Sequence, residues 1–506
     1  MFRANRKPSF VLAPAIVLIG LYSATAALCA NITFAFTSGF QSGIFPTETD
    51  SGSFGGSARL SRVIRETRLA SDRFVLLDTG DHFAGRIYSL FKGEPELELL
   101  NLDRYDAMLL GGEELAMGED LLDGWAHRAG FAPVLTNFVA PPQCKLCRHV
   151  LPYAIFERGG MKIGVFGMVP ADLSARARPA GIVDIEDDLL SVAETVVDEL
   201  SKKCEVIVML SQLDIERNIE IAGEVGAIDL IIASEWHSYA DEPIVLNNGV
   251  DMTVLVGCAE GGRARLGVLF TSWDDSGGMT EFQWSPVLID GKIPPDQKAF
   301  DIVESISNRI PPKRFVRTLD SPLDAREDIL ASGESNLGNL VCDAIISAYP
   351  QVEIALIPAG SFFGDRVLPA GILFDTDIRE VFPYNERVAI VELRGDELMR
   401  VLDESANRMG LRQNGFFQVS GLTLAMDTSS AGEGRLAEVG FRGAQLDLSA
   451  RFVVATTDFV ASGGFGYTEF AGRPFDLGRP IAETVIDYLS DGLGTPDFED
   501  RIKVLP

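Results

Sequence analysis

The sequence is poor in basic residues for its length. Its 506 residues include 44 lysines and arginines against 73 aspartates and glutamates, which leaves a formal net charge of -29 at pH 7. This balance argues against nucleic-acid binding, because neutralising phosphates needs a basic face. Hydrophobic residues make up 46% of the chain and charged residues 23%, so the composition is that of a folded globular protein and not of a disordered one. We interpret the acidic surplus as a solvated surface.

Cysteine is also scarce, with six residues in the whole chain. Cys144 and Cys147 form the one C-x-x-C, inside the proline-flanked loop PPQCKLCRHVLPY. A zinc site around them and His149 would lack a fourth ligand, because no second C-x-x-C exists, and the loop leads into a strand rather than into the helix that a redox motif requires. We therefore predict a Cys144–Cys147 disulfide, as expected in an oxidising compartment.

Long apolar runs are absent apart from one near the N-terminus, where FVLAPAIVLIGLYSATAALCA comes after the basic start MFRANRK. A basic start, an apolar centre and small residues before Asn31 predict a signal peptide over residues 1–30, cleaved near residues 26–30. The alternative is an uncleaved membrane anchor, since the run is nearly long enough to span a bilayer, but Pro14 and the small-residue exit favour cleavage. We expect an exported protein, periplasmic or extracellular, with no membrane attachment once the peptide is removed.

Internal repeats and low-complexity tracts are absent as well, and the rest of the chain alternates strand-like with helix-like segments. From residue 31 to about residue 290, short β-rich runs ending in small or polar residues are separated by amphipathic stretches. This alternation predicts βαβ units around a largely buried sheet, with the loops after the strands lining one edge. The turn-rich DGKIPPDQ and the helix-like AFDIVESISNRI predict a linker over residues 291–317, and a second α/β unit then fills residues 318–506.

Ten short motifs mark strand ends and turns in the two units. GGSARL, LLDTGDHF, YDAMLLG, VLTNF, KIGVFGM and IDLII lie in the first half, and ESNLGNLVCDA, FPYNERVAIVELRG, QVSGL and TDFVASGGFGY in the second. In this order they resemble the bacterial 5'-nucleotidase family, which also includes 2',3'-cyclic nucleotide phosphodiesterases, over nearly the whole mature chain. The resemblance implies an α/β fold with a metallophosphoesterase-like domain over residues 31–290, a layered β-sandwich with flanking helices. It also implies a C-terminal α/β substrate-recognition domain over residues 318–506, and a site closed between the two.

The resemblance further implies two-metal hydrolysis, in which about eight ligand atoms from Asp, His and Asn hold two cations that activate a water and stabilise the phosphoryl oxygens. In this chain only the bridging carboxylate Asp81 and one of the last pair of ligands, His237, keep those residue types. The other positions of the family's metal and catalytic motifs carry Gly39, Gln41, Gly112, Glu113 (in place of the catalytic His), Ala116, Gln212 and Glu235.

Histidine is scarce too, with four in the chain. His127 and His149 fall outside every metal motif, and His82 follows Asp81 directly, so on an extended segment these two side chains point to opposite sides. Asp81 and His237 alone cannot hold a binuclear pair. Without the catalytic His, the family's general acid or transition-state stabiliser is also missing.

One alternative is a rebuilt site, in which Asp81, Glu113, Glu235 and His237 converge around one weakly bound divalent cation such as Mg²⁺, Mn²⁺ or Ca²⁺. Against it, Glu114 belongs to the family scaffold, and Glu113 is equally well explained as a solvated side chain of an acidic protein.

The family's C-terminal domain grips the substrate phosphate with arginines and holds the base between two aromatic rings. Both sandwich positions are still aromatic here, as Tyr384 and Phe459, and the alternative for each is a packed core aromatic. Arg366 lies close by in the sequence as a candidate substitute for the lost arginines. The other phosphate-binding positions carry Ser332, Gly333, Pro358, Ala359, Gly360, Ser361, Phe362, Phe363 and Phe465.

Both halves of the implied site have lost charge-handling groups, while glycine turns and core strands remain. We therefore predict an exported, catalytically degenerate member of the 5'-nucleotidase lineage that binds a nucleoside-like or other planar ligand in the cleft between its domains. Two alternatives stay open: an active metal-dependent phosphoesterase with a rebuilt site, and a non-catalytic scaffold that binds a protein partner through an exposed apolar patch.

Overall fold

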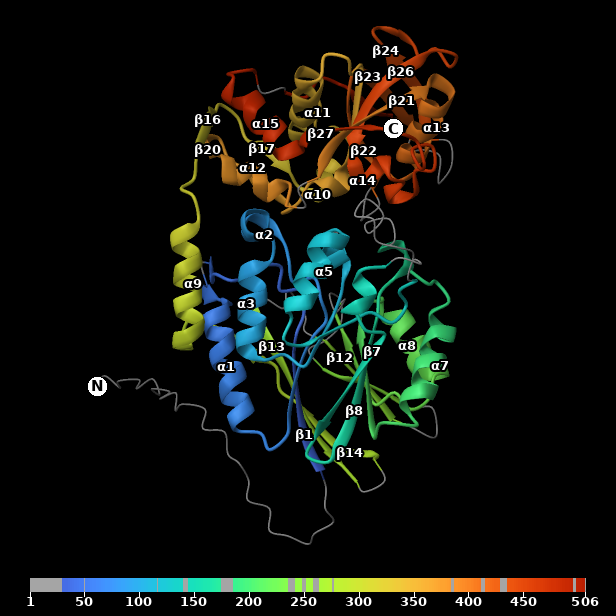
Figure 1. Cartoon of the computed structure of the whole chain (residues 1–506). Coiled ribbons are helices and arrows are strands. Elements are labelled where there is room, and N and C mark those ends of the chain that lie inside the picture. The colour runs from blue at the N-terminus through green and yellow to red at the C-terminus, as the bar shows by residue number, and fades with distance from the viewer. Residues whose placement is uncertain are drawn as a thin grey trace, which may run out of the picture.

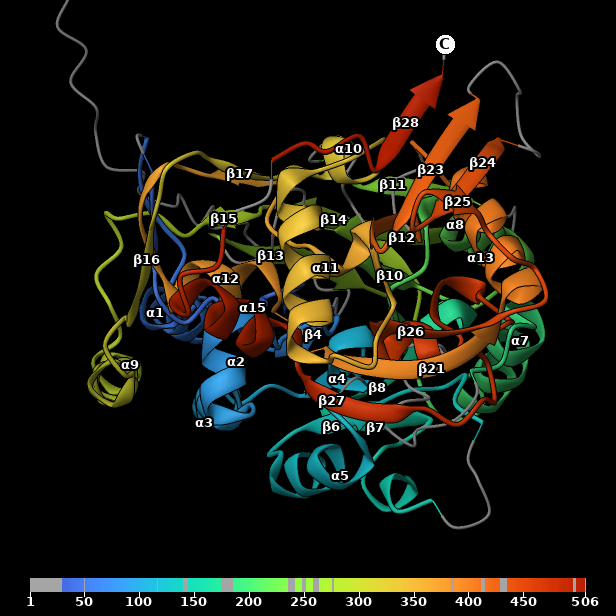
Figure 2. The same cartoon turned by 90° about the horizontal axis from the view of Figure 1, so that it is seen from above.

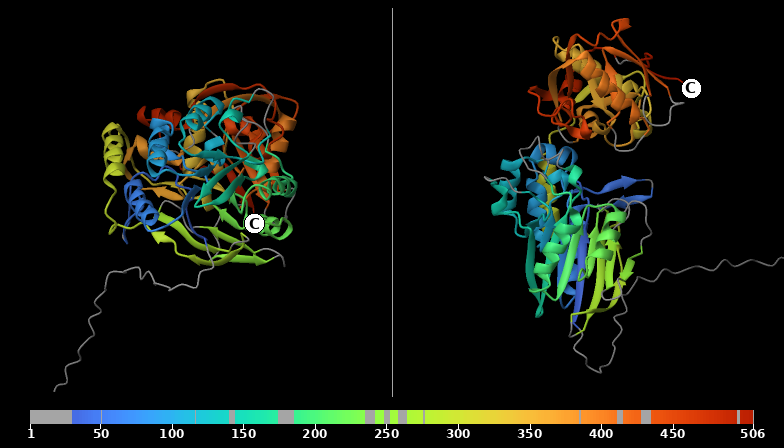
Figure 3. Two further views of the ribbon diagram at one scale, coloured as in Figure 1. Left: turned by 60° about the horizontal axis from the view of Figure 1, so that its bottom comes forward. Right: turned by 90° about the vertical axis from the view of Figure 1, so that its right-hand side faces the viewer.

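The computed structural model shows two units stacked end on end (Figures 1 and 3). It describes residues 30–505 except 50, 116, 140–143, 174–184, 235–241, 248–251, 258–263, 275–276, 384–385, 411–414, 428–434 and 495–496. The predicted signal peptide therefore lies almost entirely outside the described residues. Among the helices that are described, none combines the length and the apolar character that crossing a bilayer requires.

The first unit is built on two β-sheets that pack face to face. In spatial order, one sheet consists of β14 (Met279–Trp284), β13 (Arg265–Trp273), β1 (Ala30–Thr37), β4 (Phe74–Asp78), β5 (Ala107–Leu109) and β6 (Ala132–Val134), with β15 (Val287–Leu288) beside β13. The other consists of β11 (Ile244–Asn247), β12 (Met252–Gly257), β10 (Leu230–Ala233), β9 (Val206–Ser211), β8 (Met161–Met168) and β7 (Tyr153–Arg158). β5 and β6 face β8, and the inward side chains of both sheets share one core.

Helices cover the outer faces of this sandwich. On the first sheet these are α1 (Ser57–Leu69) and α3 (Glu94–Asp103), with α9 (Gln297–Arg309) packed outside both of them, and on the second α7 (Leu189–Leu200) and α8 (Ile215–Glu224). Shorter elements lie at one end: α2 (Gly85–Phe91), α4 (Gly112–Leu115), α5 (Glu119–Arg128) and the 3₁₀ turn η1 (Leu146–Arg148). The layered α/β sandwich predicted for the first half is confirmed, and its likeness to known structures is given below.

The central strands of the first sheet are apolar along almost their whole length because both of their faces are covered. β1 and β4 pair in parallel, as do β4 and β5, so their carboxyl ends meet at one edge. In the other sheet β8, β9 and β10 are also parallel and end at the same side of the sandwich. The loops that follow these strands therefore gather at the end of the first unit that faces the second.

The second unit has its own sheet and two cores. Its strands, in spatial order, are β22 (Phe417–Ser420), β18 (Ile354–Pro358), β26 (Arg451–Thr457), β21 (Arg387–Arg394) and β27 (Asp476–Pro480). One face packs against α11 (Asn336–Ala348) and α15 (Ile481–Ser490), and the other against α13 (Gly395–Asn407). Because side chains alternate along a strand, Ala355 and Ile357 of β18 enter the first core while Ile354 and Leu356 enter the second.

Smaller elements complete the second unit. A four-stranded sheet consists of β25 (Ala444–Gln445), β24 (Leu436–Phe441), β23 (Leu422–Asp427) and β28 (Ile502–Leu505). Two further pairs are β16 (Phe315–Leu319) with β20 (Gly371–Phe374), and β17 (Leu323–Ala325) with β19 (Arg366–Leu368). Three short helices, α10 (Glu327–Leu330), α12 (Asp375–Val381) and α14 (Asp458–Ala461), face the first unit (Figure 1).

The two units touch through short helices beside the connection formed by α9. α2 of the first unit packs against α12 of the second. Arg86 of α2 donates a hydrogen bond from Nη2 to the carbonyl oxygen of Pro311, 2.5 Å away, just beyond the end of α9. The loop edge of the first sandwich is thus held next to the second unit.

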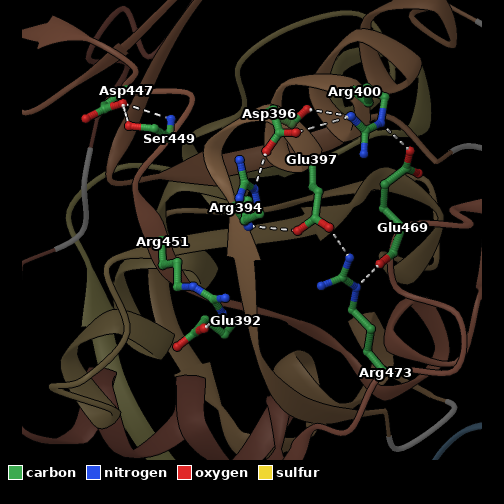
Figure 4. A network of polar contacts seen from close by, with 10 residues as sticks. All are labelled: Glu392, Arg394, Asp396, Glu397, Arg400, Asp447, Ser449, Arg451, Glu469 and Arg473. Carbon is green, nitrogen blue, oxygen red and sulfur yellow. Dashed lines mark hydrogen bonds and ion pairs between the residues drawn. The ribbon is translucent and has the colours of Figure 1, made fainter.

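A network of ion pairs surrounds the start of α13 on the surface of the second unit (Figure 4). Glu397 accepts a hydrogen bond from the backbone N–H of Arg394 at 2.8 Å and also pairs with Arg473. Arg400 in turn binds Glu469 at 3.1 Å. The hydrogen bonds from Arg394 and then from Arg473 hold the pKa of Glu397 below its usual value. Glu397 therefore joins the first turn of the helix to a distant part of the chain.

We expect Glu397→Gln to lower the free energy of unfolding by about 1 kcal/mol at neutral pH, because it removes the charged partner of Arg473. Since the folded pKa of Glu397 is depressed, its contribution is present above the unfolded pKa and is lost as the pH falls through the folded pKa. Urea unfolding at several pH values measures this. Glu392→Gln, which loses a more exposed pair with Arg451, is the control and should change stability by less than about 0.5 kcal/mol. Equal losses from both variants would contradict the assignment.

Candidate functional site

The fully buried carboxylate of Asp78 ends β4 at the edge where the loops converge. Thr37 ends the neighbouring strand β1, directly opposite in the register, and its Oγ1 donates to Asp78 Oδ2 at 2.5 Å. The backbone N–H of Gly80 donates to Asp78 Oδ1 at 2.7 Å. His82 Nδ1 lies 3.3 Å from Asp78 Oδ2, close enough for an ion pair when the imidazole is protonated. Asp78 thus ties its own loop to β1.

His82 belongs to the core of this loop region. Its side chain is buried and stacks on Phe40, with ring centroids 4.8 Å apart. Burial pulls the pKa of His82 down, but the charge and hydrogen bond of Asp78, with the charges of Glu114 and Glu96, raise that pKa above its ordinary value. Asp78 therefore favours the protonated form of the imidazole, against the effect of burial.

The prediction that the segment carrying Asp81 and His82 is extended is wrong. Asp81 has a φ of 54°, in the left-handed region, and Gly80 before it has a φ of 85°, so the chain makes a tight turn here. The two side chains separate through this turn and not through strand alternation. His82 turns toward Asp78, while Asp81 Oδ1 accepts a hydrogen bond from the backbone N–H of Glu113 at 3.1 Å.

Glu114 holds the loop after β4 and the loop after β5 together. Its side chain is fully buried, and its oxygens accept hydrogen bonds from the backbone N–H groups of Asp81 at 2.9 Å, His82 at 2.7 Å and Gly111 at 2.8 Å. Burial and the charge of Asp81 raise the pKa of Glu114 to about 7, against the lowering effect of the three N–H donors. The geometry is that of a structural clamp, with both carboxylate oxygens in use.

Gln212 occupies the position of a histidine ligand in the implied site and makes a different contact. It follows β9 of the second sheet, and its Nε2 donates to the carbonyl oxygen of Thr79 at 2.9 Å. A Cβ added to Gly111 would stand only 2.0 Å from Gln212 Nε2 and 2.7 Å from Asp81 Oδ1. The amide therefore fills the space beside Asp81 and links the loops of the two sheets.

Asp81 and Glu113 are brought together, as the alternative of a rebuilt site requires. The Glu113 side chain is 9% exposed. Burial raises the pKa of Tyr88, and the charges of Glu113, Glu114 and Glu96 add to that effect. Carboxylates thus crowd this part of the first unit. Glu235 and His237, the other two members of the alternative site, lie outside the described residues, as does Ala116.

The residues present do not fit a two-metal centre. Within the described ranges no group of three or more His, Cys, Asp or Glu side chains is arranged to hold a metal ion. Asp78 and Glu114 have their oxygens engaged by protein groups, and Gln212 directs its amide N–H to a carbonyl. The polar groups next to the positions where the resemblance implies metal ligands are thus hydrogen-bonded within the protein.

In the second unit, Phe459 is partly buried on α14. Its ring packs edge-on against Phe465, with centroids 5.0 Å apart, and lies where a Cβ on Gly464 would stand. Phe465, at the position where the resemblance implies an aspartate, has a positive φ of 54°. Its side chain offers Phe459 an aromatic contact in place of the implied carboxylate. Tyr384, the other predicted aromatic, lies outside the described residues.

Arg366, the candidate substitute for the phosphate arginines, is bound within the second unit. Its Nη1 donates to Glu380 at 2.8 Å and its Nη2 to the carbonyl oxygen of Asp377 at 3.3 Å. Ala359 and Ser361 of the altered turn are buried, and Gly333 O accepts a hydrogen bond from Gln418. These contacts give the altered positions structural roles.

Arg408, which the sequence did not single out, lies beside the altered glycine turn. Its guanidinium stacks over the ring of Tyr467 at 4.9 Å and donates to Glu404 at 2.7 Å. A Cβ on Gly415 would stand 3.1 Å from both Arg408 Nη1 and Phe465 Cβ. No motif marks Arg408, because its neighbours come from distant parts of the chain.

The two cysteines of the C-x-x-C are joined in a disulfide, with Cα atoms 5.5 Å apart. The backbone N–H of Cys147 also donates to Cys144 Sγ at 3.0 Å. The disulfide encloses η1 at the edge of the first unit, where Lys145 pairs with Asp120 of α5.

The comparisons with known proteins agree with this architecture. Residues 317–472 match the family described as 5'-nucleotidase, C-terminal domain. The chain is 25% identical to a trifunctional nucleotide phosphoesterase protein of Bacillus subtilis, over 88% of this chain but 34% of that one, so it spans about a third of that relative. It is 24% identical to the 5'-nucleotidase of Homo sapiens, over 98% of this chain and 95% of that one. Its fold is similar to the crystal structure of a 5'-nucleotidase precursor from Thermus thermophilus, with a TM-score of 0.78 and 24% identity over 94% of this chain and 99% of that one.

Proposed function

The chain belongs to the 5'-nucleotidase family of hydrolases, and from this premise we propose that it is an exported member that has lost phosphoester hydrolysis and binds a small planar ligand between its two units. One observation carries the proposal. At the loop edge of the first unit, the polar groups beside the missing metal ligands are bonded to one another: Asp78 to Thr37 and Gly80, and Gln212 to Thr79. Asp78 and Gln212 therefore have hydrogen-bond partners without a cation.

Elemental analysis of the purified protein tests the loss of the metal pair. We expect less than one equivalent of any transition metal that depends on Asp81, measured by comparing the wild type with Asp81→Ala. One equivalent of a divalent cation in the wild type that disappears in Asp81→Ala would support the rebuilt site, with Glu113, Glu235 and His237 as its remaining ligands.

The residues present in the second unit indicate which class of ligand would bind. Phe459 still offers a partly exposed ring, whereas the phosphate arginines are gone and Arg366 is bound to Glu380. A neutral planar molecule can therefore bind without burying an unpaired charge. A nucleotide would bring a phosphate charge that has no cationic partner in this acidic protein.

We expect adenosine to raise the melting temperature more than AMP does, because a ligand that binds only the folded state stabilises it by mass action, by about 2.7 kcal/mol at a hundredfold excess over Kd. Differential scanning fluorimetry measures the shift, with Phe459→Ala and Tyr384→Ala as the variants that should abolish it and Phe315→Ala, an exposed phenylalanine on β16, as the control. A larger shift with AMP would contradict the proposal. Indifference to both ligands would favour the protein-binding scaffold.

Export is the remaining part of the proposal. We expect intact mass spectrometry of protein recovered from the culture medium or the periplasm to show a chain that begins between residues 27 and 31. The basic start and apolar centre of residues 1–30 are the features that a signal peptidase substrate needs. Recovery of the intact N-terminus from the membrane fraction would show an anchor instead.

A further inference from the structure

Two of the three histidines in the described part of the chain lie against each other, away from the site discussed above. His127 is exposed on the last turn of α5, and His149 immediately follows η1 after the disulfide loop. Their ring centroids are 4.8 Å apart and the ring planes are inclined by 60°. α5 lies at the outer edge of the molecule in Figure 2. His127 is exposed and His149 is partly exposed, so the pair is accessible from solvent.

A carboxylate accompanies the two imidazoles. Asp123 precedes His127 by four residues on α5, which places both side chains on one face of the helix. Asp123 Oδ1 lies 3.9 Å from His149 Nε2, and this buried oxygen has no hydrogen-bond partner. Because a buried carboxylate oxygen without a donor is costly, a cation held between these groups would remove that cost.

We propose that His127, His149 and Asp123 bind a borderline transition-metal dication such as Zn²⁺, at a site unconnected with phosphoester chemistry. Imidazole and carboxylate are donors that suit this class of ion. With a zinc–nitrogen bond of about 2.0–2.1 Å, two imidazoles on one tetrahedral ion have ring centres about 5 Å apart. The observed 4.8 Å already matches that spacing.

The third donor, Asp123, would have to move only a short distance to bind the same ion. Two donor atoms on a tetrahedral zinc stand about 3.3 Å apart, so Asp123 Oδ1 and His149 Nε2, at 3.9 Å, must approach by less than about 1 Å. As these side chains stand, no group of three or more His, Cys, Asp or Glu in the described residues is arranged to hold a metal ion, so binding requires the three side chains to change position. Both side chains are 29% exposed and can move.

Two nearby cations, Arg128 and Lys145, are held by other groups. Arg128 follows His127 but donates to Glu94 at 2.7 Å and to Gly124 O at 3.0 Å. Lys145, at the start of the disulfide loop, pairs with Asp120 at 2.6 Å. With a net charge of -29, the whole protein also attracts cations to its surface. A metal here would join α5 to the loop that carries His149.

Isothermal titration calorimetry with Zn²⁺ tests the site on the mature protein purified without reductant, so that the Cys144–Cys147 disulfide contributes no thiolate. We expect His127→Gln and His149→Gln each to weaken the zinc affinity by at least about tenfold, and Asp123→Asn to weaken it severalfold. Asp120→Asn removes a carboxylate from the same helix and is the matched control, with unchanged affinity.

Asp81→Ala separates this site from the remnant ligands of the implied active site. Unchanged zinc binding by Asp81→Ala supports the proposal whether or not the protein hydrolyses phosphoesters. The proposal is overturned if the wild type binds no zinc, if both histidine variants keep the wild-type affinity, or if only Asp81→Ala loses it. X-ray absorption at the zinc edge gives a second readout on unmutated protein: histidine ligation is expected, and a shell of oxygen alone would refute the site.

Discussion

The purified protein should release no measurable phosphate from AMP and no p-nitrophenol from bis-p-nitrophenyl phosphate, even with millimolar Mn²⁺ or Co²⁺. Two-metal hydrolysis needs cations that activate the water and stabilise both the attacking and the leaving oxygen. The position at which the resemblance implies the catalytic histidine carries Glu113, and losing a general acid or base alone costs about 10²–10⁴-fold in rate. A carboxylate at that position also repels the charge that develops on the phosphoryl group.

A single restored residue should not recover activity. In Glu113→His the imidazole would return, but Gln212 would still fill the space beside Gly111 with its amide, and Gly112 would still offer no side-chain ligand. The assay compares wild type, Asp81→Ala and Glu113→His under the same metals. Metal-dependent turnover in the wild type that Asp81→Ala abolishes would show that the site was rebuilt, and the proposed loss of function would be wrong.

The α/β architecture was predictable because it is encoded locally. Apolar runs such as those of β1 and β4 are long enough to read as buried strands, and amphipathic segments such as that of α9 repeat with the helical period. Asp78 and Asp81 were also identifiable, since they follow a buried strand in a short motif. In these cases the information lies within about ten consecutive residues.

The contacts that define the candidate site were not predictable, because they join residues far apart in the sequence. Gln212 reaches Thr79 across two sheets, and the sequence shows Gln212 only as a missing histidine. The tight turn at Asp81 depends on a positive φ that alternation of side chains cannot reveal. His127 and His149 were set aside as lying outside every motif, and folding alone brings them together.

Replacing Glu114 should strongly destabilise the first unit. Three backbone N–H groups lose their acceptor in Glu114→Ala: those of His82 and Gly111, which are buried, and that of Asp81, which is part-buried. Each buried donor left without a partner costs about 1–3 kcal/mol, so we expect the unfolding free energy to fall by at least about 3 kcal/mol. Glu98→Ala, at an exposed position of α3, is the control and should have little effect.

The loss from Glu114→Ala should also depend on pH in a direction that the pKa sets. Burial and the charge of Asp81 raise the folded pKa of Glu114 to about 7 from an ordinary value of 4.5. Its contribution to stability is therefore complete below the unfolded pKa and declines as the pH rises through the folded pKa. Scanning calorimetry should then show a larger difference between wild type and Glu114→Ala at pH 5 than at pH 8. A difference that grows with pH would mean that the three N–H donors outweigh burial and that Glu114 is held as a carboxylate throughout.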